Sequence, residues 1–371
     1  MANGPIIEIW MSRPDWREMG GPVSHLPVLI DRLERRPQMR LRTFVYGGRK
    51  LGPLPRKFSE FLPVKVLLTF FDWFKFLLML LIHERPHIIH LNSVFDYFGI
   101  LRDLPYLAVA RLLGVPCLVK THGSNEFLIR DQRRMVHVVR SWHLRLVSAI
   151  TLLSPVETAE FQAIFPQYAS KFHTAKNIVQ HGTLRGKPKA QGTVLFAGRF
   201  VEKKNIPALF SAVAKLLAEG VHLELLMAGD GPMRAELQAL AAKLDIEAQV
   251  KFLGWLDQSA LLKRIAESGL VVFCSHGSEG MPMIIIETLR TDSLLLVAPQ
   301  RFTESYNLRD CGVIYLDNDT SEELAAGVRG AMGGRVSAQE LLARDAFFLQ
   351  FSAQRVTDEF CELYFSLLPT V

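Results

Sequence analysis

Short apolar runs alternate with helix-like stretches along almost the whole chain, and this alternation most limits how it can fold. In the first half, strand-like runs occur at 5–10, 41–47, 87–93, 115–123 and 149–155. Between two of them lies DLPYLAVARLLG (103–114), whose apolar residues have helical spacing. Strands that alternate with helices predict a parallel sheet covered by helices on both faces.

A second alternation follows a polar stretch rich in Gly and Lys, QHGTLRGKPKAQG at 180–192. Strand-like runs then recur at 193–199, 222–231, 249–255, 270–275 and 294–300. At 371 residues the chain suits two domains. We therefore predict α/β architecture with two doubly wound domains, at 1–180 and 193–350, joined by a linker at 181–192. Ligands bind such sheets at the carboxyl ends of the strands, so the site is expected in the cleft where the domains face each other.

The cysteines and the N-terminal residues indicate in which cellular compartment the protein is expected. Four cysteines are scattered without a C-x-x-C pair, which argues against a zinc site and a disulfide framework and suits a reducing cytoplasm. No basic region followed by a long apolar stretch opens the chain, so we expect no secretory signal.

Charge is unevenly distributed between the halves. Residues 1–180 carry 24 Lys and Arg against 14 Asp and Glu, whereas residues 181–371 carry 19 against 23. A basic first half suggests an anionic partner, either nucleic acid or an anionic membrane surface. Trp142 lies within a basic stretch that contains Arg130, Arg133, Arg134, Arg140 and Arg145. Because no nucleic-acid module is recognisable there, a membrane or lipid-phosphate surface is favoured and nucleic acid is not expected as a partner.

One segment, FLPVKVLLTFFDWFKFLLMLLI at 61–82, is intensely apolar and aromatic. Lys65, Asp72 and Lys75 argue against a membrane-spanning helix, since each charge at the bilayer centre costs roughly 2.5–3.5 kcal/mol. Two interpretations stay open: a buried helix of the first domain, or an interfacial helix that dips into a membrane.

The stretch SEGMPMIIIE at 278–287 holds two carboxylates around a predicted helix start. Pro282 suits the first helical turn, and the N–H groups of Met283 and Ile284 are then free to face an anion. Glu279 falls in the loop ahead of this helix. Glu287 lies five residues past Pro282, about 7.5 Å along the helix axis. Two carboxylates that bind hydroxyls on either side of an anion match the sugar, diphosphate and ribose of a nucleotide sugar.

Counter-charge for that anion is present in AGRFVEKKN at 197–205. Arg199 and Lys204 follow a predicted strand, in the loop where such sheets bind ligands. An arginine can fork onto phosphate oxygens, and a lysine acts as a mobile point charge.

Together, GRFVEKK, AGDGPMRAEL, FLGWLDQSALLKRIAES, SEGMPMIIIE and FSAQRVTDEFCELYFSLL resemble retaining glycosyltransferases of family 4, which have the GT-B fold. The resemblance is specific across 194–300 and looser in the first domain, where GG at 20–21, RPHIIHLNS and KTHG correspond to early motifs of the family. It implies that a helix within 351–371 crosses back to pack on the first domain. It also implies a hexosyltransferase-like enzyme with a nucleotide-sugar substrate.

The resemblance assigns a role to each candidate residue. Arg199 and Lys204 would hold the donor diphosphate, and Glu287 the ribose hydroxyls. Glu279 would contact the hydroxyls of the transferred sugar, and His122 would lie near the same sugar. Gly20 and Gly21 would permit close backbone approach to donor or acceptor.

The sequence departs from the family at Met281 and Pro282, where Phe and Gly are usual, and at APQRFTESYNLRDCG in place of a glycine-rich loop. Donor identity therefore does not carry over. We expect sugar transfer to a hydroxyl acceptor, lipid-linked or part of a cell-envelope polysaccharide, without an essential metal or other cofactor. The expected location is cytoplasmic, peripheral on the inner face of the cytoplasmic membrane. Two alternatives remain: a GT-B-type sugar-nucleotide epimerase, and a non-catalytic nucleotide-sugar-binding subunit.

Overall fold

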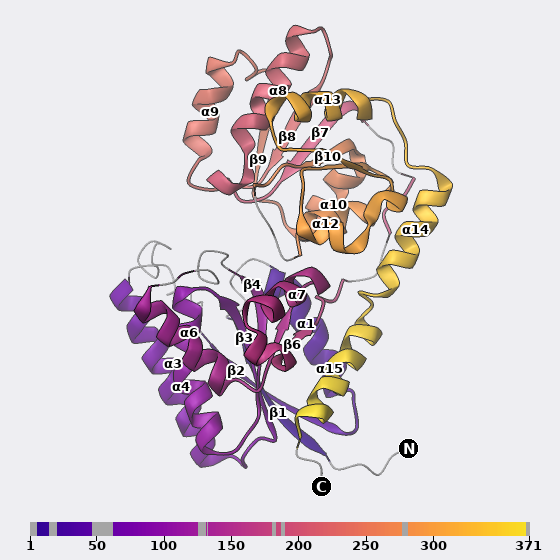
Figure 1. The fold of residues 1–371 in the computed structure, drawn as a ribbon. Helices are drawn as coiled ribbons and strands as arrows, with labels where there is room; N and C mark the ends of the chain where they lie inside the picture. The colour runs from indigo at the N-terminus through magenta and orange to yellow at the C-terminus, as the bar shows by residue number, and fades with distance from the viewer. Residues whose placement is uncertain are drawn as a thin grey trace. The chain divides into compact units, whose positions relative to one another are not determined.

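The computed structural model describes residues 6–14, 21–46, 62–124, 131, 133–179, 183–186, 190–276 and 281–368. The chain divides into two compact units, one of residues 1–180 and 350–371 and the other of residues 181–349 (Figure 1). Each unit is built on a parallel sheet with helices on its faces, so the prediction of two doubly wound α/β domains is confirmed.

The first unit contains a six-stranded sheet in the order β2-β1-β3-β4-β5-β6, with every pair parallel. Its strands are β1 (Ile7–Arg13), β2 (Met39–Val45), β3 (Ile88–Phe95), β4 (Cys117–Ser124), β5 (Ala149–Leu152) and β6 (Phe172–Thr174). Its described helices are α1 (Gly21–Glu34), α3 (Leu62–Ile82), α4 (Tyr97–Leu112), α6 (Arg134–Leu146), α7 (Pro155–Ile164), the 3-10 helix η1 (Pro166–Lys171) and α15 (Ala353–Leu367).

The two faces of this sheet carry separate cores. Side chains of α3, α4, α6 and α7 pack on one face, with Phe76, Tyr106, Leu144 and Phe161 fully or almost fully buried. On the other face, α1 packs with α15, whose Phe360 is fully buried. The last helix thus belongs to the first unit, which explains why residues 350–371 group with residues 1–180.

The second unit has a six-stranded parallel sheet in the order β12-β11-β10-β7-β8-β9. Its strands are β7 (Ala190–Ala197), β8 (Glu224–Ala228), β9 (Val250–Gly254), β10 (Ser268–Phe273), β11 (Leu294–Val297) and β12 (Val313–Tyr315). Its described helices are η2 (Glu202–Lys204), α8 (Ile206–Ala218), α9 (Arg234–Lys243), α10 (Gln258–Glu267), α11 (Met283–Leu289), α12 (Arg301–Tyr306), η3 (Leu308–Cys311), α13 (Ser321–Ala331) and α14 (Ala338–Leu349). Strand β7 begins at Ala190, inside the stretch expected to be a linker.

The strand order of the second unit is that of a dinucleotide-binding Rossmann sheet. From β7 the sheet grows in one direction through β8 and β9, and from β10 it grows in the other through β11 and β12, so the strand order reverses between β7 and β10. Ligands bind such sheets beyond the carboxyl ends of the strands at this reversal. The fold therefore places the loop after β7 and the segment after β10 where a ligand is expected.

Helix α3 is not the buried helix that one interpretation of 61–82 required. Only Asp72 and Phe76 are buried among its described side chains, whereas Leu67 and Phe70 are 69% and 62% exposed. The helix contacts the core through Phe76 and the partly buried Trp73, Met79 and Leu80, which lie on one side of it. Within the described part of the chain, no helix combines the length and hydrophobicity needed to cross a membrane.

Candidate nucleotide-sugar site

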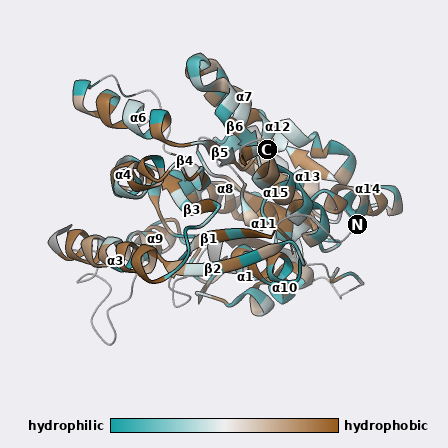
Figure 2. Cartoon of the chain, turned by 90° about the horizontal axis from the view of Figure 1, so that it is seen from below, coloured by the Kyte–Doolittle hydropathy of each residue, from teal (hydrophilic) through white to brown (hydrophobic). Residues whose placement is uncertain are grey.

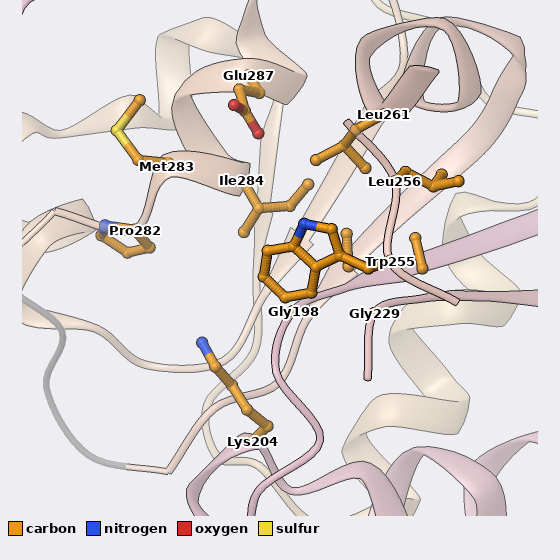
Figure 3. A pocket seen from close by; sticks show the side chains of 12 residues that line it. Gly198, Lys204, Gly229, Trp255, Leu256, Leu261, Pro282, Met283, Ile284 and Glu287 are labelled. Carbon is orange, nitrogen blue, oxygen red and sulfur yellow. The ribbon is translucent and has the colours of Figure 1, made fainter. Parts of the chain in front are cut away.

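A pocket of about 190 Å³ opens at the carboxyl edge of the second sheet (Figure 3). Four chain segments line it, from the ends of β7, β8 and β9 and the start of α11. The lining residues are Ala197, Gly198, Lys204, Ala228, Gly229, Trp255, Leu256, Leu261, Pro282, Met283, Ile284 and Glu287. The pocket therefore lies at the strand-order reversal and brings together Lys204, Met283, Ile284 and Glu287, four of the residues predicted from the sequence.

Glycines allow the loops after β7 and β8 to approach each other at the floor of this pocket. A Cβ on Gly229, whose φ is +146°, would lie 1.9 Å from the carbonyl oxygen of Gly198. A Cβ on Gly231 would lie 2.4 Å from the carbonyl oxygen of Phe200. Since real Cβ atoms do not come so close to backbone oxygen, only glycine fits at these positions. The GDGP stretch at 229–232 thus has a packing role beside the site.

Lys204 reaches the pocket from η2, which is tied to the end of β10. Its carbonyl oxygen accepts a hydrogen bond from Cys274 Sγ at 3.3 Å, and His276 N donates to the carbonyl oxygen of Lys203 at 2.7 Å. Asn205 then adopts left-handed geometry with φ of 51° and allows α8 to begin at Ile206. The Lys204 ammonium lies 5.1 Å from the centre of the Phe273 ring. A basic group is thus held at the edge of the pocket by backbone contacts.

Helix α11 starts one residue later than the sequence predicted. Pro282 is its N-cap, with ψ of 109°, rather than a residue of its first turn. The expectation of proline inside the first turn was therefore wrong, because its extended backbone places Pro282 just before the helix. The cap makes no side-chain hydrogen bond to the first turn, and Met283 and Ile284 line the pocket.

Glu287 lies on α11 with only 7% of its surface exposed. Burial raises the pKa of its carboxyl group to about 7, although the Arg290 charge and a hydrogen bond from Gln258 act in the opposite direction. A carboxylate held this way gains from any hydrogen-bond donor that a ligand supplies, since such donors favour the ionised form. In Figure 3, Glu287 and Lys204 lie at opposite ends of the pocket with Trp255 between them.

Trp255 is the main pocket residue that the sequence analysis did not single out. It directly follows β9 and stays 50% exposed although it lines a pocket. Leu256 and Leu261 continue the same wall. Its position at the end of a predicted strand, QVKFLGW at 249–255, was the available signal, because ligands meet such sheets at strand ends.

Of the remaining predicted residues, those that the structure describes do not line this pocket. Arg199 is exposed in the loop after β7 and does not line it. Gly21 is the first residue of α1. Glu279 and Gly20 lie outside the described residues.

His122 belongs to the first unit, near the carboxyl end of β4. Its Nε2 lies 3.1 Å from Asn92 Oδ1, and its ring centre is 6.0 Å from that of His25. Burial lowers the pKa of His122 well below its usual value, and the nearby Lys120 and His90 charges add to this. His122 Nδ1 is buried and has no hydrogen-bond partner among the described residues. A neutral imidazole with one unused nitrogen is therefore present at the carboxyl edge of this sheet.

Two Rossmann-like units, one of them with a pocket at the reversal of its strand order, are the architecture of GT-B proteins, and this chain has that architecture. The solved structure of the Anabaena protein HepE in complex with UDP and glucose is similar to this fold, with a TM-score of 0.69 over 97% of this chain and 100% of that chain at 14% identity. This likeness confirms the predicted GT-B fold.

Residues 184–341 match the family described as glycosyl transferases group 1. A 2-deoxystreptamine glucosyltransferase of Streptomyces kanamyceticus is 31% identical over 168 residues, covering 40% of this chain and 43% of the relative. A lipopolysaccharide core biosynthesis glycosyltransferase of Rhizobium meliloti, LpsE, is 28% identical over 179 residues, covering 47% and 50%. The aligned part thus spans about half the length of these relatives.

Proposed function

We propose that this protein is a retaining glycosyltransferase that moves a sugar from a nucleotide-sugar donor to a hydroxyl acceptor. One observation carries the proposal. Within the part of the chain that matches the group 1 glycosyl transferases, one pocket is lined by Lys204, by the start of α11, which has no side-chain cap, and by the buried Glu287. The complex of HepE with UDP and glucose supports a nucleotide sugar as the donor.

The donor diphosphate would bind at the Lys204 end of the pocket. The Lys204 ammonium and the N–H groups of Met283 and Ile284 would stabilise the negative charge that grows on the leaving diphosphate. Arg199, in the exposed loop that leads to Lys204, would bind phosphate oxygens with both arms of its guanidinium from outside the pocket. In this proposal these side chains and backbone groups stabilise the charge of the leaving diphosphate, so we propose sugar transfer without a metal or other cofactor.

Glu287 would accept hydrogen bonds from the two ribose hydroxyls. The pocket, at about 190 Å³, is smaller than the ~300–1,000 Å³ typical of pockets that enclose a whole ligand, so we propose that it holds only the nucleoside part of the donor, between Lys204 and Glu287. Trp255 offers an aromatic face to the base, with Leu256 and Leu261 beside it.

The transferred sugar would be contacted by Glu279 and His122, with Gly20 and Gly21 allowing close backbone approach. We assign Glu279 to hydroxyl positioning rather than covalent attack. His122 suits the same task because a neutral imidazole can accept a hydrogen bond from a sugar hydroxyl.

The acceptor would be a saccharide, lipid-linked or part of a cell-envelope polysaccharide. The likeness to a lipopolysaccharide core biosynthesis glycosyltransferase supports this class. We place the protein in the cytoplasm, bound peripherally at the inner face of the cytoplasmic membrane, because its first half is basic and α3 exposes apolar side chains. The epimerase alternative is not favoured, since the curated relatives described above are glycosyltransferases.

A thermal-shift screen with UDP-, GDP- and ADP-sugars tests the donor site. A ligand at 100 times its Kd stabilises the folded state by about 2.7 kcal/mol, so at least one nucleotide sugar should raise the Tm by several degrees. Glu287→Ala and Lys204→Ala should remove the increase, whereas Lys203→Ala, next to Lys204 but outside the pocket lining, should keep it. If no nucleotide sugar stabilises the wild-type protein, the proposal is wrong.

Transfer itself needs a second assay, which separates an enzyme from a non-catalytic binding subunit. The stabilising nucleotide sugar is incubated with lipid-linked and free saccharide acceptors, and the product's anomeric configuration is read by NMR. A product that keeps the donor configuration supports retaining transfer. Donor binding without any turnover across these acceptors would favour the non-catalytic alternative.

A further inference from the structure

Helix α3 presents an apolar stripe to solvent. Its exposed large apolar side chains are Val66, Leu67, Phe70, Phe71, Phe74, Leu78, Leu81 and Ile82. At 100° per residue these positions fall within one half of the helix circumference, and the buried Asp72 and Phe76 lie on the other half. Figure 2 shows the hydrophobic colour along much of this helix. The half of the helix that faces away from the core is thus apolar as well.

An exposed apolar stripe of this length requires a partner, because soluble proteins rarely expose contiguous apolar patches larger than a few hundred Å². Two phenylalanines one turn apart, Phe70 and Phe74, are 62% and 56% exposed. The charged Asp72 is only 2% exposed and so does not face outward. Lys75 lies at the edge of the stripe, 4.6 Å from the centre of the Phe71 ring, where a long side chain can extend to water while its stem stays in apolar surroundings.

Helix α6 adds cations and a second apolar strip. Met135, Val138 and Trp142 are exposed at helical spacing, with Trp142 60% accessible. Arg134 and Arg145 are exposed on the adjoining side, and the helix contains no acidic residue. Tryptophan beside arginine is typical of helices that lie in the headgroup region of a bilayer.

The two helices belong to one layer of the first unit. Phe76 of α3, Tyr106 of α4 and Leu144 of α6 enter the same core. Figure 2 shows α4 between α3 and α6, and both helices contact α4. Their outward sides can therefore reach one extended surface.

We propose that α3 and α6 form a docking surface for an anionic phospholipid bilayer, with the α3 stripe inserted among the acyl chains near the headgroups. The arginines of α6 contact lipid phosphates, and this charge complementarity identifies the occupant. A second copy of the chain would set like charges of α6 against each other, and nucleic acid would leave the apolar stripe of α3 uncovered. This proposal rests on the peripheral membrane location proposed above and names the surface responsible, but it does not depend on glycosyl transfer.

Flotation of the full chain with phosphatidylcholine vesicles, with and without phosphatidylglycerol, tests this surface. Binding should require phosphatidylglycerol. Phe70→Ser with Phe74→Ser should weaken it by at least about tenfold for each phenylalanine removed. Arg134→Gln with Arg145→Gln should weaken vesicle binding about fivefold for each arginine. High salt should abolish the contribution of the arginines but not that of the phenylalanines.

The matched control is Leu342→Ser with Leu349→Ser, which removes apolar side chains that are 70% and 65% exposed on α14. It should bind vesicles like the wild type. All variants change exposed side chains, and circular dichroism checks that they fold. As a second measurement, brominated lipid should quench wild-type fluorescence, and Trp142→Phe should reduce the quenching.

Three results would overturn the proposal. The first is a wild-type chain that does not float with phosphatidylglycerol vesicles. The second is equal binding by the Phe70/Phe74 and Leu342/Leu349 variants. The third is a concentration-dependent dimer that these phenylalanine changes dissociate, without vesicle binding. Because flotation needs no donor or acceptor, its failure is separable from failure of the proposed enzymatic function.

Discussion

Asn92 Oδ1 faces His122 Nε2 at 3.1 Å and can only accept a hydrogen bond there. The amide of Asn92 is fixed in this orientation because its Nδ2 donates to the carbonyl oxygen of Ser12 at 2.7 Å. Its backbone N–H also donates to Ser12 Oγ at 2.7 Å. Neutral His122 therefore carries its proton on Nε2, which leaves Nδ1 as an acceptor.

Asn92→Ala should remove the hydrogen bond that keeps the proton of His122 on Nε2. The 15N chemical shifts of His122 should move toward a mixture of the two neutral forms. If His122 positions the transferred sugar, turnover should fall by about five- to tenfold, the effect of one lost hydrogen bond, while donor KM changes little. Asn92→Asp keeps the acceptor, so it should preserve the tautomer while its charge raises the pKa of His122. Unchanged nitrogen shifts in Asn92→Ala would contradict the assignment.

Glu287→Gln should make the protein more stable and the donor site weaker. The folded-state pKa of about 7 exceeds the unfolded value of 4.5, so between these values the native state binds more protons than the unfolded chain. Stability is therefore lost as the pH rises through this window. Glutamine removes that loss, so at pH 8 the variant should have a higher Tm than the wild type and a free energy of unfolding that is higher by about 3 kcal/mol.

At pH 5 the two proteins should differ little in Tm, which serves as the control for Glu287→Gln. Ribose hydroxyls favour the ionised carboxylate, so wild-type donor affinity should fall as the pH drops below 7. Calorimetric titration at pH 6 and pH 8 checks this. A donor affinity that is equal at both values in the wild type would exclude Glu287 as a titrating contact.

Trp255→Ala should weaken binding of the free nucleotide as well as of the nucleotide sugar. Base stacking on an aromatic side chain contributes about 1–3 kcal/mol, and Trp255→Phe should retain most of it. Trp142→Ala is the matched control, since Trp142 is similarly exposed but lies in the first unit. Equal nucleotide affinities of Trp255→Ala and Trp142→Ala in calorimetry would place the base elsewhere.

Gly231→Ala should destabilise the second unit, because the new Cβ would meet backbone atoms of Phe200 at 2.4–2.8 Å. Overpacking of this kind typically costs about 1–3 kcal/mol. Gly330→Ala is a suitable comparison, since Gly330 lies within α13 and a Cβ there meets no atom within 4 Å. That change should be neutral or stabilising by up to about 1 kcal/mol. Chemical denaturation compares the two, and an equal effect would argue against close packing of the loops.

Much of the fold could be predicted because buried parallel strands read as continuous apolar runs. LVVF of β10 and LLLV of β11 are examples. The edge strands β6 and β12 were missed, since three residues are too few for a pattern. The helix start at Met283 was misplaced by one residue, because proline is compatible with both the first turn and the preceding extended residue.

The sequence by itself determined the two α/β units and which strand ends carry polar side chains, because both depend on local periodicity and on turn chemistry. Lys204 and Glu287 could be found in this way. Only the tertiary structure decided that Trp255 joins them in one pocket and that Glu287 is buried, since both depend on the strand order. It also decided which half of α3 faces outward, because an apolar helix packs by whichever edge its neighbours can cover, and here that edge is the one with Phe76.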